Sequence, residues 1–205
     1  MSRPHYNLYI DGNWVSGGDA QVMESLNPAT QKVWATFDCA SAADVNTAVK
    51  AARTALNAPE WRDMLPTQRG KLLYKLADLI EIEAQKLGRI ETTDSGKLAK
   101  ETISQTAYVA DYYRYYAGLA DKIEGATLPI DKADVHAYTT REPIGIVAAI
   151  VPWNAQMFLA ATKIAPALAA GCCVIVKASE MAPCAMFEFA KLFDDAGFPL
   201  SLIHI

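Results

Sequence analysis

Hydrophobic side chains recur every three or four positions between residues 41 and 117, which is the spacing of helices with one buried face. Ser41, with Asp44 in the turn after it, indicates a helix start, and Pro66 opens a second, long helix. A break at Ser95-Gly96 separates this helix from a third. The apolar stripes are Val45, Ala48, Val49 and Ala52, then Leu72, Leu73, Leu76, Leu79 and Ile80, then Ile103, Ala107, Ala110, Tyr113 and Ala117.

Short strand-like segments flank this helical region on both sides. Leu8-Tyr9-Ile10 and Trp14-Val15 surround the turn dipeptide Asp11-Gly12, which predicts a small hairpin. After Gly125, the β-favouring segments 127–130 and 135–140 predict the two strands of another hairpin.

From residue 144 the hydrophobic pattern changes to continuous apolar runs. The run Ile144 to Val151 ends at Pro152-Trp153-Asn154, a helical stretch follows from Met157 to Ala170, and a second run extends from Cys172 to Val176. A further helix is expected from about Pro183 to Ala196. Uninterrupted apolar strands joined by a helix predict a parallel sheet covered on both faces. Ligands of such sheets bind beyond the carboxyl ends of the strands.

Composition narrows the classes of function. The chain has 205 residues, of which 52% are hydrophobic and 20% charged, as in folded globular proteins. A formal charge of −4 with interspersed signs argues against a nucleic-acid or anionic-membrane surface, and favours a small-molecule ligand. No apolar signal core opens the chain and no run is long enough to span a membrane, so we expect a cytoplasmic protein.

The cysteines and histidines predict no metal site. Cys39, Cys172, Cys173 and Cys184 lack C-x-x-C spacing, and His136 has no second ligand at a suitable distance in sequence. Because the adjacent pair Cys172 and Cys173 falls within a predicted buried strand, we interpret it as core rather than as a nucleophile.

The polar residues at the two predicted strand ends are the candidate site. Lys177 and Glu180 are suited to hold a ribose, because ammonium donors and carboxylate acceptors complement vicinal hydroxyls. A solvated ion pair is the alternative. Asn154 supplies an uncharged amide donor that suits an oxyanion, but it is equally a preferred helix cap.

Several motifs together resemble the aldehyde dehydrogenase superfamily. They are Ile10-Asp11-Gly12, Asn27-Pro28-Ala29-Thr30, Trp61-Arg62, Thr93-Asp94-Ser95-Gly96-Lys97, Arg141-Glu142-Pro143-Ile144-Gly145, Val151-Pro152-Trp153-Asn154, Pro166-Ala167-Leu168-Ala169-Ala170-Gly171 and Lys177-Ala178-Ser179-Glu180. The resemblance implies an α/β fold: the N-terminal part of the aldehyde dehydrogenase fold, with helices, the start of a Rossmann-like parallel sheet and a β-hairpin oligomerisation element. It divides the chain into a helical part of the cofactor domain (1–124), the hairpin (125–143), a first βαβα unit of the NAD-binding domain (144–199) and an atypical tail (200–205).

The same resemblance implies an oxidoreductase that converts an aldehyde to a carboxylic acid with NAD(P). Asn154 matches the oxyanion-stabilising amide, whereas the cysteine nucleophile and the glutamate base of the family would lie beyond Ile205, so this chain alone is expected to be inactive. The residues implied to contact the cofactor are Ile150, Val151, Pro152, Trp153, Asn154, Lys177, Ser179 and Glu180. We prefer NAD, since the Glu180 carboxylate would repel the 2′-phosphate of NADP, although NADP stays open because Lys177 and Ser179 would soften that repulsion.

Three departures from the family pattern bear on these expectations. Ala155-Gln156 stands where relatives commonly place an aromatic residue and a proline near the substrate tunnel, which leaves the aldehyde open. Cys172-Cys173 replaces small or polar residues. The tail 200–205 lacks the expected glycine and valine-rich strand, and we expect an interrupted chain whose parallel sheet has an uncovered edge. The full-length protein is expected to form a homo-oligomer; the alternative is a short, non-catalytic protein that binds nucleotide or associates with a relative.

Overall fold

A three-stranded parallel sheet of order β10-β9-β8 lies at the centre of the computed structural model, which describes residues 3–18 and 21–205. Its strands are β8 (Ile146–Ile150), β9 (Cys173–Lys177) and β10 (Ile203–His204). Helix α5 (Gln156–Ala169) connects β8 to β9, and α6 (Cys184–Ala196) connects β9 to β10. The predicted strand–helix–strand–helix order is therefore confirmed, with element ends shifted by at most two residues.

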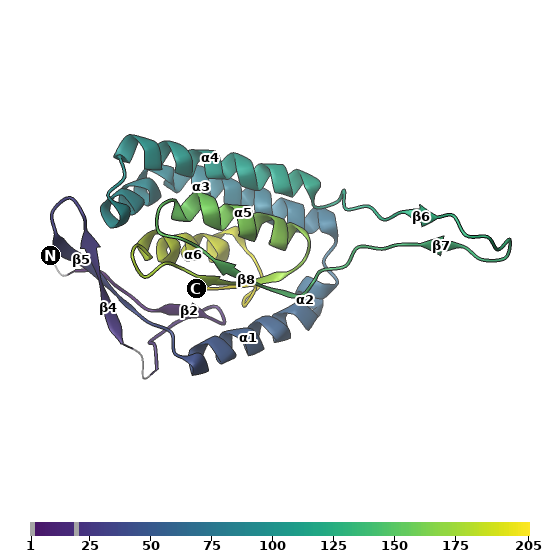
Figure 1. Ribbon diagram of the computed structural model, residues 1–205, viewed down its shortest axis with the longest axis horizontal. Helices are drawn as coiled ribbons and strands as arrows, with labels where there is room; N and C mark the ends of the chain where they lie inside the picture. Colours follow the sequence, from purple (N-terminus) through teal and green to yellow (C-terminus); the bar gives the residue numbers. More distant parts are fainter. Residues whose placement is uncertain (1–2, 19–20) are drawn as a thin grey trace.

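Helices cover both faces of this sheet (Figure 1). Helices α5 and α6 lie on one face, with the long helices α3 (Pro66–Ser95) and α4 (Ala99–Leu119) outside them, while α1 (Ala42–Asn57) lies on the other face. The short helix α2 (Pro59–Arg62) follows α1. One cluster of buried apolar side chains extends across these layers, so segments 42–119 and 146–203 share a single core.

Local chemistry explains where these helices begin and end. The Ser41 hydroxyl accepts from the Asp44 backbone N–H at 3.2 Å, and the Asp44 carboxylate accepts from the Ser41 N–H at 2.8 Å. This reciprocal pair forms a capping box at the N-terminus of α1. Gly96, at φ 77°, ends α3 and turns the chain back into α4. The two helices then approach closely, because a Cβ on Gly88 would lie 2.6 Å from the Cα of Ile103.

The N-terminal segment forms a predicted hairpin and a second sheet that the pattern did not predict. Strands β2 (Leu8–Ile10) and β3 (Asn13–Val15) pair antiparallel, with positive φ at both turn residues, Asp11 and Gly12. Strands β1 (His5–Tyr6), β4 (Val22–Asn27) and β5 (Lys32–Asp38) form the second sheet, of order β1-β5-β4.

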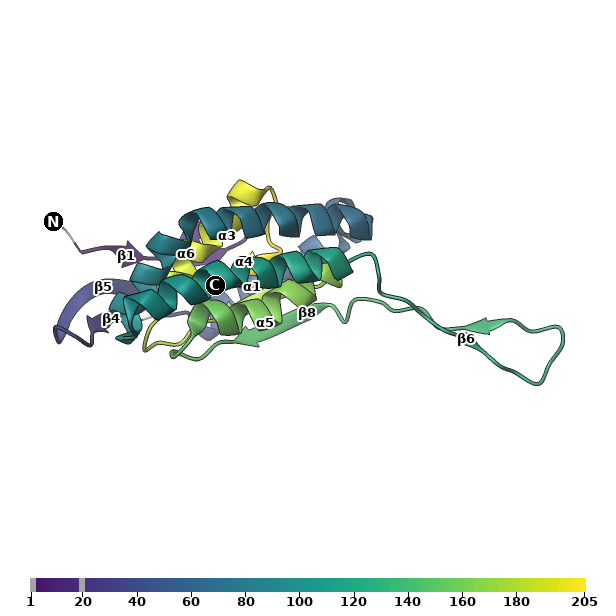
Figure 2. The same cartoon turned by 90° about the horizontal axis from the view of Figure 1, so that it is seen from above.

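The second predicted hairpin projects away from the body of the molecule (Figures 1 and 2). Its strands β6 (Thr127–Leu128) and β7 (Ala137–Tyr138) are shorter than predicted, and nearly every side chain between residues 121 and 144 is exposed. Within the described residues, no helix combines the length and hydrophobicity that a membrane crossing requires.

The segment 200–205 continues the fold instead of standing apart from it. Ile203 and His204 pair in parallel with Val174 and Ile175 and add a third strand, so the expectation of a sheet ending at its second strand is corrected. Tyr9 and Ile205 exchange both backbone hydrogen bonds at 2.9 Å, and thereby join this strand to the N-terminal hairpin. The pattern missed this strand because it is only two residues long.

His204 in β10 is buried and makes two hydrogen bonds. Its Nδ1 accepts from the Asp11 backbone N–H at 3.2 Å, and its Nε2 lies 3.0 Å from the Ser201 carbonyl, which requires Nε2 to donate. This is the neutral ring. Burial lowers the pKa of His204, although the Ser201 carbonyl and the Asp11 carboxylate oppose the shift.

A lowered pKa in the folded state makes acid destabilising through this histidine. We expect the free energy of unfolding to be highest above the unfolded pKa of about 6.5, and to fall as the pH drops through the folded pKa of His204. Urea titrations at several pH values between neutral and mildly acidic should show a shallower pH dependence in His204→Gln. The control His136→Gln changes an exposed histidine on the hairpin. Equal slopes in all three proteins would contradict the expectation.

Candidate functional site

The parallel pairing of β8 with β9 brings the two predicted strand ends together. Ile150 lies opposite Lys177, and the Val151 N–H donates to the Lys177 carbonyl at 3.0 Å. The turns that follow, 152–155 and 178–183, therefore leave the sheet from the same edge. This adjacency is the main geometric expectation from the sequence, and the structure confirms it.

Lys177 and Glu180 form an ion pair at this edge. The Lys177 Nζ donates to Glu180 Oε2 at 2.7 Å, and the two side chains are 62% and 53% exposed. The bond from Lys177 lowers the pKa of the Glu180 carboxyl. The geometry is that of a solvated ion pair, which was the alternative. The Lys177 ammonium nevertheless has two further N–H donors that a ligand could use.

A cavity of about 460 Å³ opens beside this pair, within the range of roughly 300–1,000 Å³ that small-molecule sites occupy. Four predicted residues line it: Ile150, Lys177, Ser179 and Glu180. Ser179 is almost buried, and its hydroxyl accepts from the Met181 N–H at 3.3 Å. The ammonium and the carboxylate at the rim with mainly apolar walls behind them fit a nucleoside, which combines hydroxyls with a flat base.

The other wall of this cavity comes from segments far away in the sequence. It includes Leu8, Ile10, Phe37, Cys39, Val45 and His204. Sequence reasoning missed these residues because no local signal marks them. Val45 and Val49, predicted to lie on the buried face of their helix, are instead 47% and 37% exposed, and Val45 forms part of the cavity wall.

Pro152, Trp153 and Asn154 form an exposed turn outside the cavity. Helix α5 has Ala155 as its N-cap and receives no side-chain capping bond, so the interpretation of Asn154 as a helix cap is wrong. Within the described residues the Asn154 amide has no recorded hydrogen-bond partner, which leaves its donors free for a ligand. Val151 before it is buried, and anchors the turn to the sheet.

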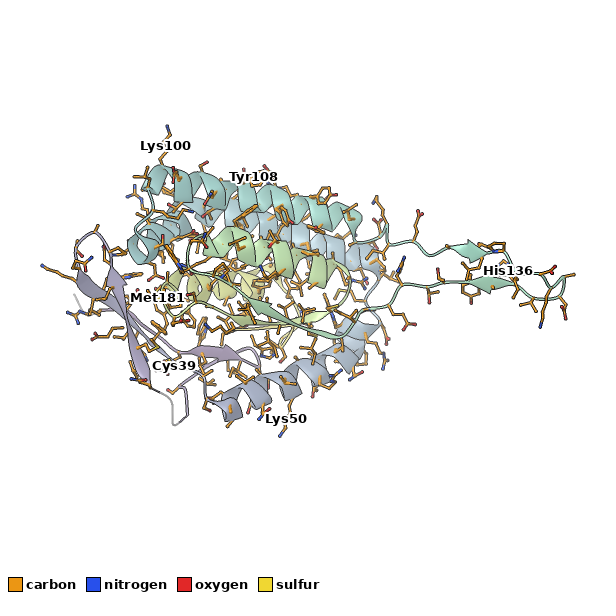
Figure 3. All side chains as sticks on the ribbon, viewed as in Figure 1. Cys39, Lys50, Lys100, Tyr108, His136 and Met181 are labelled. Carbon is orange, nitrogen blue, oxygen red and sulfur yellow. The ribbon has the colours of Figure 1, made fainter. Side chains whose placement is uncertain are left out.

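The residue pair after Asn154 differs in environment. Ala155 is half-buried, whereas Gln156 is fully buried and both atoms of its amide lack a partner within the described residues. Phe158, two residues after Gln156, packs against the rings of Tyr108 and Tyr112 from α4. Tyr108, labelled on α4 in Figure 3, is 56% exposed beside this contact.

None of the four cysteines has the surroundings of an activated thiolate. Cys172, Cys173 and Cys184 are buried, which confirms the interpretation of the adjacent pair as core. Burial and the neighbouring Cys172 raise the pKa of Cys173 to about 12. Cys39 at the cavity is partly exposed, but burial and the carboxylates of Asp38 and Glu180 raise its pKa as well. Among the described residues, no group of three or more His, Cys, Asp or Glu side chains is arranged to hold a metal ion.

Comparison with known proteins extends over nearly the whole chain. Residues 14–205 match the sequence profile described as the aldehyde dehydrogenase family. The chain is 56% identical over 200 residues to a (Z)-2-((N-methylformamido)methylene)-5-hydroxybutyrolactone dehydrogenase of Acinetobacter baylyi, covering 98% of this chain and 41% of that protein. It is 43% identical to a putative aldehyde dehydrogenase of Bacillus subtilis, covering 97% of this chain and 40% of the relative.

Solved structures agree with this result. An NAD-dependent aldehyde dehydrogenase from Sinorhizobium meliloti superposes with a TM-score of 0.94 at 32% identity, over 99% of this chain and 41% of that one. A betaine aldehyde dehydrogenase from Staphylococcus aureus in complex with NAD+ superposes with a TM-score of 0.93 at 35% identity, over 97% and 39%. The chain spans about two fifths of the length of the relatives it matches. It belongs to the aldehyde dehydrogenase family.

Proposed function

We propose that this chain contributes the oxyanion amide and the ribose-binding side of the cofactor site to an enzyme that oxidises an aldehyde to a carboxylic acid with NAD. The observation that supports this most directly is the pairing of Ile150 with Lys177, which sets the Asn154 turn and the Lys177–Glu180 pair on one sheet edge beside a cavity. NAD, when bound, accepts the hydride from the substrate carbon.

Asn154 is proposed to stabilise the charge that develops on the aldehyde oxygen. Its amide is exposed and uncommitted, so it can donate to an oxyanion without breaking an existing bond. The backbone of Ile150 and Val151, with the turn residues Pro152 and Trp153, is proposed to line the cofactor cleft next to it.

Lys177 and Glu180 are proposed to bind the adenosine ribose, and the apolar cavity walls to receive the base. Glu180 favours NAD over NADP, because its carboxylate would face the negative 2′-phosphate. Ser179 lines the same cavity and is proposed to contact the cofactor, because accepting the Met181 N–H leaves its own O–H free to donate.

We further propose that the nucleophile and the general base come from a longer form of the protein. The cysteines of this chain are unsuited to the role, because burial raises the pKa of each of the Cys39, Cys173 and Cys184 thiols. We also propose that the protein is cytoplasmic, a reducing compartment in which its four cysteines would stay free thiols.

The projecting hairpin 125–143 is proposed as the oligomerisation element of the protein. Four apolar side chains on it are 43–66% exposed: Leu128, Ile130, Val135 and Tyr138. Figure 2 shows that the hairpin extends beyond the helices, where a second subunit can pair with it. This division of the chain treats 1–124 and 144–199 as parts of one cofactor domain, consistent with their shared core.

Alkylation rates measure the accessibility and reactivity of the four thiols. With iodoacetamide at neutral pH, we expect slow labelling of Cys39 and no labelling of Cys172, Cys173 or Cys184 in the folded chain, because burial restricts access and disfavours the thiolate. Mass spectrometry of tryptic peptides reports each site, and the unfolded chain serves as the control for full labelling. Rapid modification of Cys172 or Cys173 would contradict the proposal, because it would reveal an activated nucleophile within this chain.

Aldehyde-dependent NADH formation tests the proposed activity. We expect no turnover by residues 1–205 and turnover by the protein obtained when the reading frame is followed past Ile205. In that longer protein, Asn154→Ala should lower kcat by about 10²–10³-fold, the usual effect of removing one oxyanion donor. The control Asn46→Ala removes an exposed asparagine from α1. Turnover by the short chain, or full activity of Asn154→Ala, would overturn the assignment.

Light scattering tests the role of the hairpin. Replacing Leu128 and Tyr138 together with lysine should reduce the molar mass of the assembled protein to that of a smaller species, because charges at a buried interface core are costly. The control Ile82→Lys changes a side chain that is 74% exposed on α3. An unchanged mass in the hairpin variant would place the subunit contact elsewhere.

A further inference from the structure

The cavity wall that comes from β5 belongs to the second sheet, which packs on α6 through a small core of its own. Phe37 near the end of β5 and Cys39 just after it, labelled in Figure 3, line the cavity. Phe37, Tyr6 and Phe187 of α6 belong to one buried cluster, in which the Tyr6 and Phe187 rings stack at 5.3 Å. Apolar packing is non-directional, so it holds the sheet against α6 without fixing its position along the helix.

Asp94 supplies a directional contact at this joint. It lies in the last turn of α3, is 1% exposed, and its Oδ2 accepts from the Cys184 N–H at 2.7 Å. Cys184 is the first residue of α6, and Pro183 before it supplies no capping bond. The first N–H groups of a helix have no acceptor within it, so the Asp94 carboxylate serves as the acceptor for one of them.

The other oxygen of Asp94 binds the second sheet. Oδ1 accepts from the Ser25 hydroxyl of β4, and from the Trp34 indole N–H of β5 at 3.2 Å. The same indole N–H also donates to Ser25 Oγ at 2.9 Å, so the three side chains form a closed set of hydrogen bonds. Ser25 is 1% exposed, like Asp94, and water therefore has little access to their bond.

A β-bulge directs the Trp34 side chain to this carboxylate. Ser25 pairs with Ala35 and Leu26 pairs with Val33, so Trp34 is an extra residue in β5. In a regular strand neighbouring side chains alternate between the faces of the sheet, whereas a bulge re-aims one of them. The Trp34 indole therefore reaches Ser25, although Ala35 is the residue opposite Ser25 in the ladder.

We propose that Asp94 is a positioning residue for the cofactor cavity, which holds the wall from β5 at a fixed distance from the turn that carries Glu180. One carboxylate oxygen binds the second sheet, and the other binds the start of α6 directly after that turn. The inference rests on the proposed function, in which this cavity receives NAD. Cys39 lies five residues after Trp34, and Glu180 lies four residues before Cys184, so each oxygen of Asp94 restrains one wall.

A carboxylate suits this role because both of its oxygens accept hydrogen bonds, whereas an amide has one acceptor and one donor group. In Asp94→Asn, the amide oxygen can still accept from the Cys184 N–H, which has no means of accepting. The amide nitrogen then faces Ser25, whose hydroxyl can turn to accept from it. The Trp34 N–H loses its charged acceptor, so the substitution loosens the wall from β5 in particular.

Alkylation of Cys39 in residues 1–205 tests the proposal without cofactor. In Asp94→Asn, iodoacetamide should label Cys39 about fivefold faster than in the unaltered chain, because the wall from β5 has lost a hydrogen bond to a charged group. Cys173 in the main core should stay unlabelled. An unchanged rate at Cys39 would overturn the proposal, as would labelling of Cys173 as well, which indicates a loss of overall stability.

Thr92→Val is the matched control on the same helix. It removes the 2.7 Å hydrogen bond between the hydroxyls of Thr92 and Thr102, which joins α3 to α4 away from the cavity. The rates at Cys39 and Cys173 should equal those of the unaltered chain. Faster labelling of Cys39 in this control would show that any lost bond of α3 opens the cavity, and would contradict a specific role of Asp94.

Trp34→Phe provides a second variant if Asp94→Asn does not fold. It removes the indole N–H and leaves the bond between Asp94 and the Cys184 N–H in place. Cys39 should again react faster, while amide hydrogen exchange at Cys184 in the 15N-labelled chain should not change. Faster exchange at Cys184, or an unchanged rate at Cys39, would overturn the separate restraint of the two walls.

NAD binding separates this inference from the proposed function. In the longer protein, calorimetry should show NAD binding about fivefold weaker in Asp94→Asn and unchanged in Thr92→Val. Undiminished NAD binding in Asp94→Asn, beside faster labelling of Cys39, would contradict the positioning role. Absence of NAD binding by every protein, together with the expected labelling pattern, would refute the proposed ligand and still support the placement of the wall from β5 by Asp94.

Discussion

The parallel hydrogen bonding between β8 and β9 is the constraint on which the site depends. Parallel strands end at the same edge, so the turns after Ile150 and Lys177 meet although twenty-seven residues separate them in sequence. The Val151 N–H extends the ladder one residue beyond the strand and holds the first turn against the second. The exposed amide of Asn154 and the exposed Lys177–Glu180 ion pair therefore lie at the same edge of the sheet.

The helices of the first half support this edge more than they contribute to it. Helix α3 contacts both α5 and α6, the helices that connect the strands of the parallel sheet. Helix α4 packs along α3, and the two backbones approach closely at Gly88. The cost is two carboxylates in the core. Burial raises the pKa of both Glu91 and Asp94; Asp94 accepts from the Cys184 N–H and the Ser25 hydroxyl, and the Lys97 ammonium lies 3.6 Å from Glu91 Oε1.

The polar candidate residues and most of the cysteines of this chain lie in different environments. Asn154, Lys177 and Glu180 present exposed polar groups at this edge, whereas Cys172, Cys173 and Cys184 are buried and Cys39 lies in the cavity wall. The structure of this part is consistent with its two-fifths share of the relatives' length.

The sequence by itself determined the main helices, the parallel pairing of β8 with β9 and the candidate residues at the strand ends. These features follow from local causes: hydrophobic period, caps at Ser41 and Pro66, and the glycine at 96. Tertiary structure decided what local pattern does not carry. Pairing with β9 makes Ile203 and His204 a strand. Ala155, not Asn154, is the N-cap of α5. Residues of the N-terminal hairpin and of α1 line the cavity. Contacts between distant segments decide these features, and no period or spacing along the chain records them.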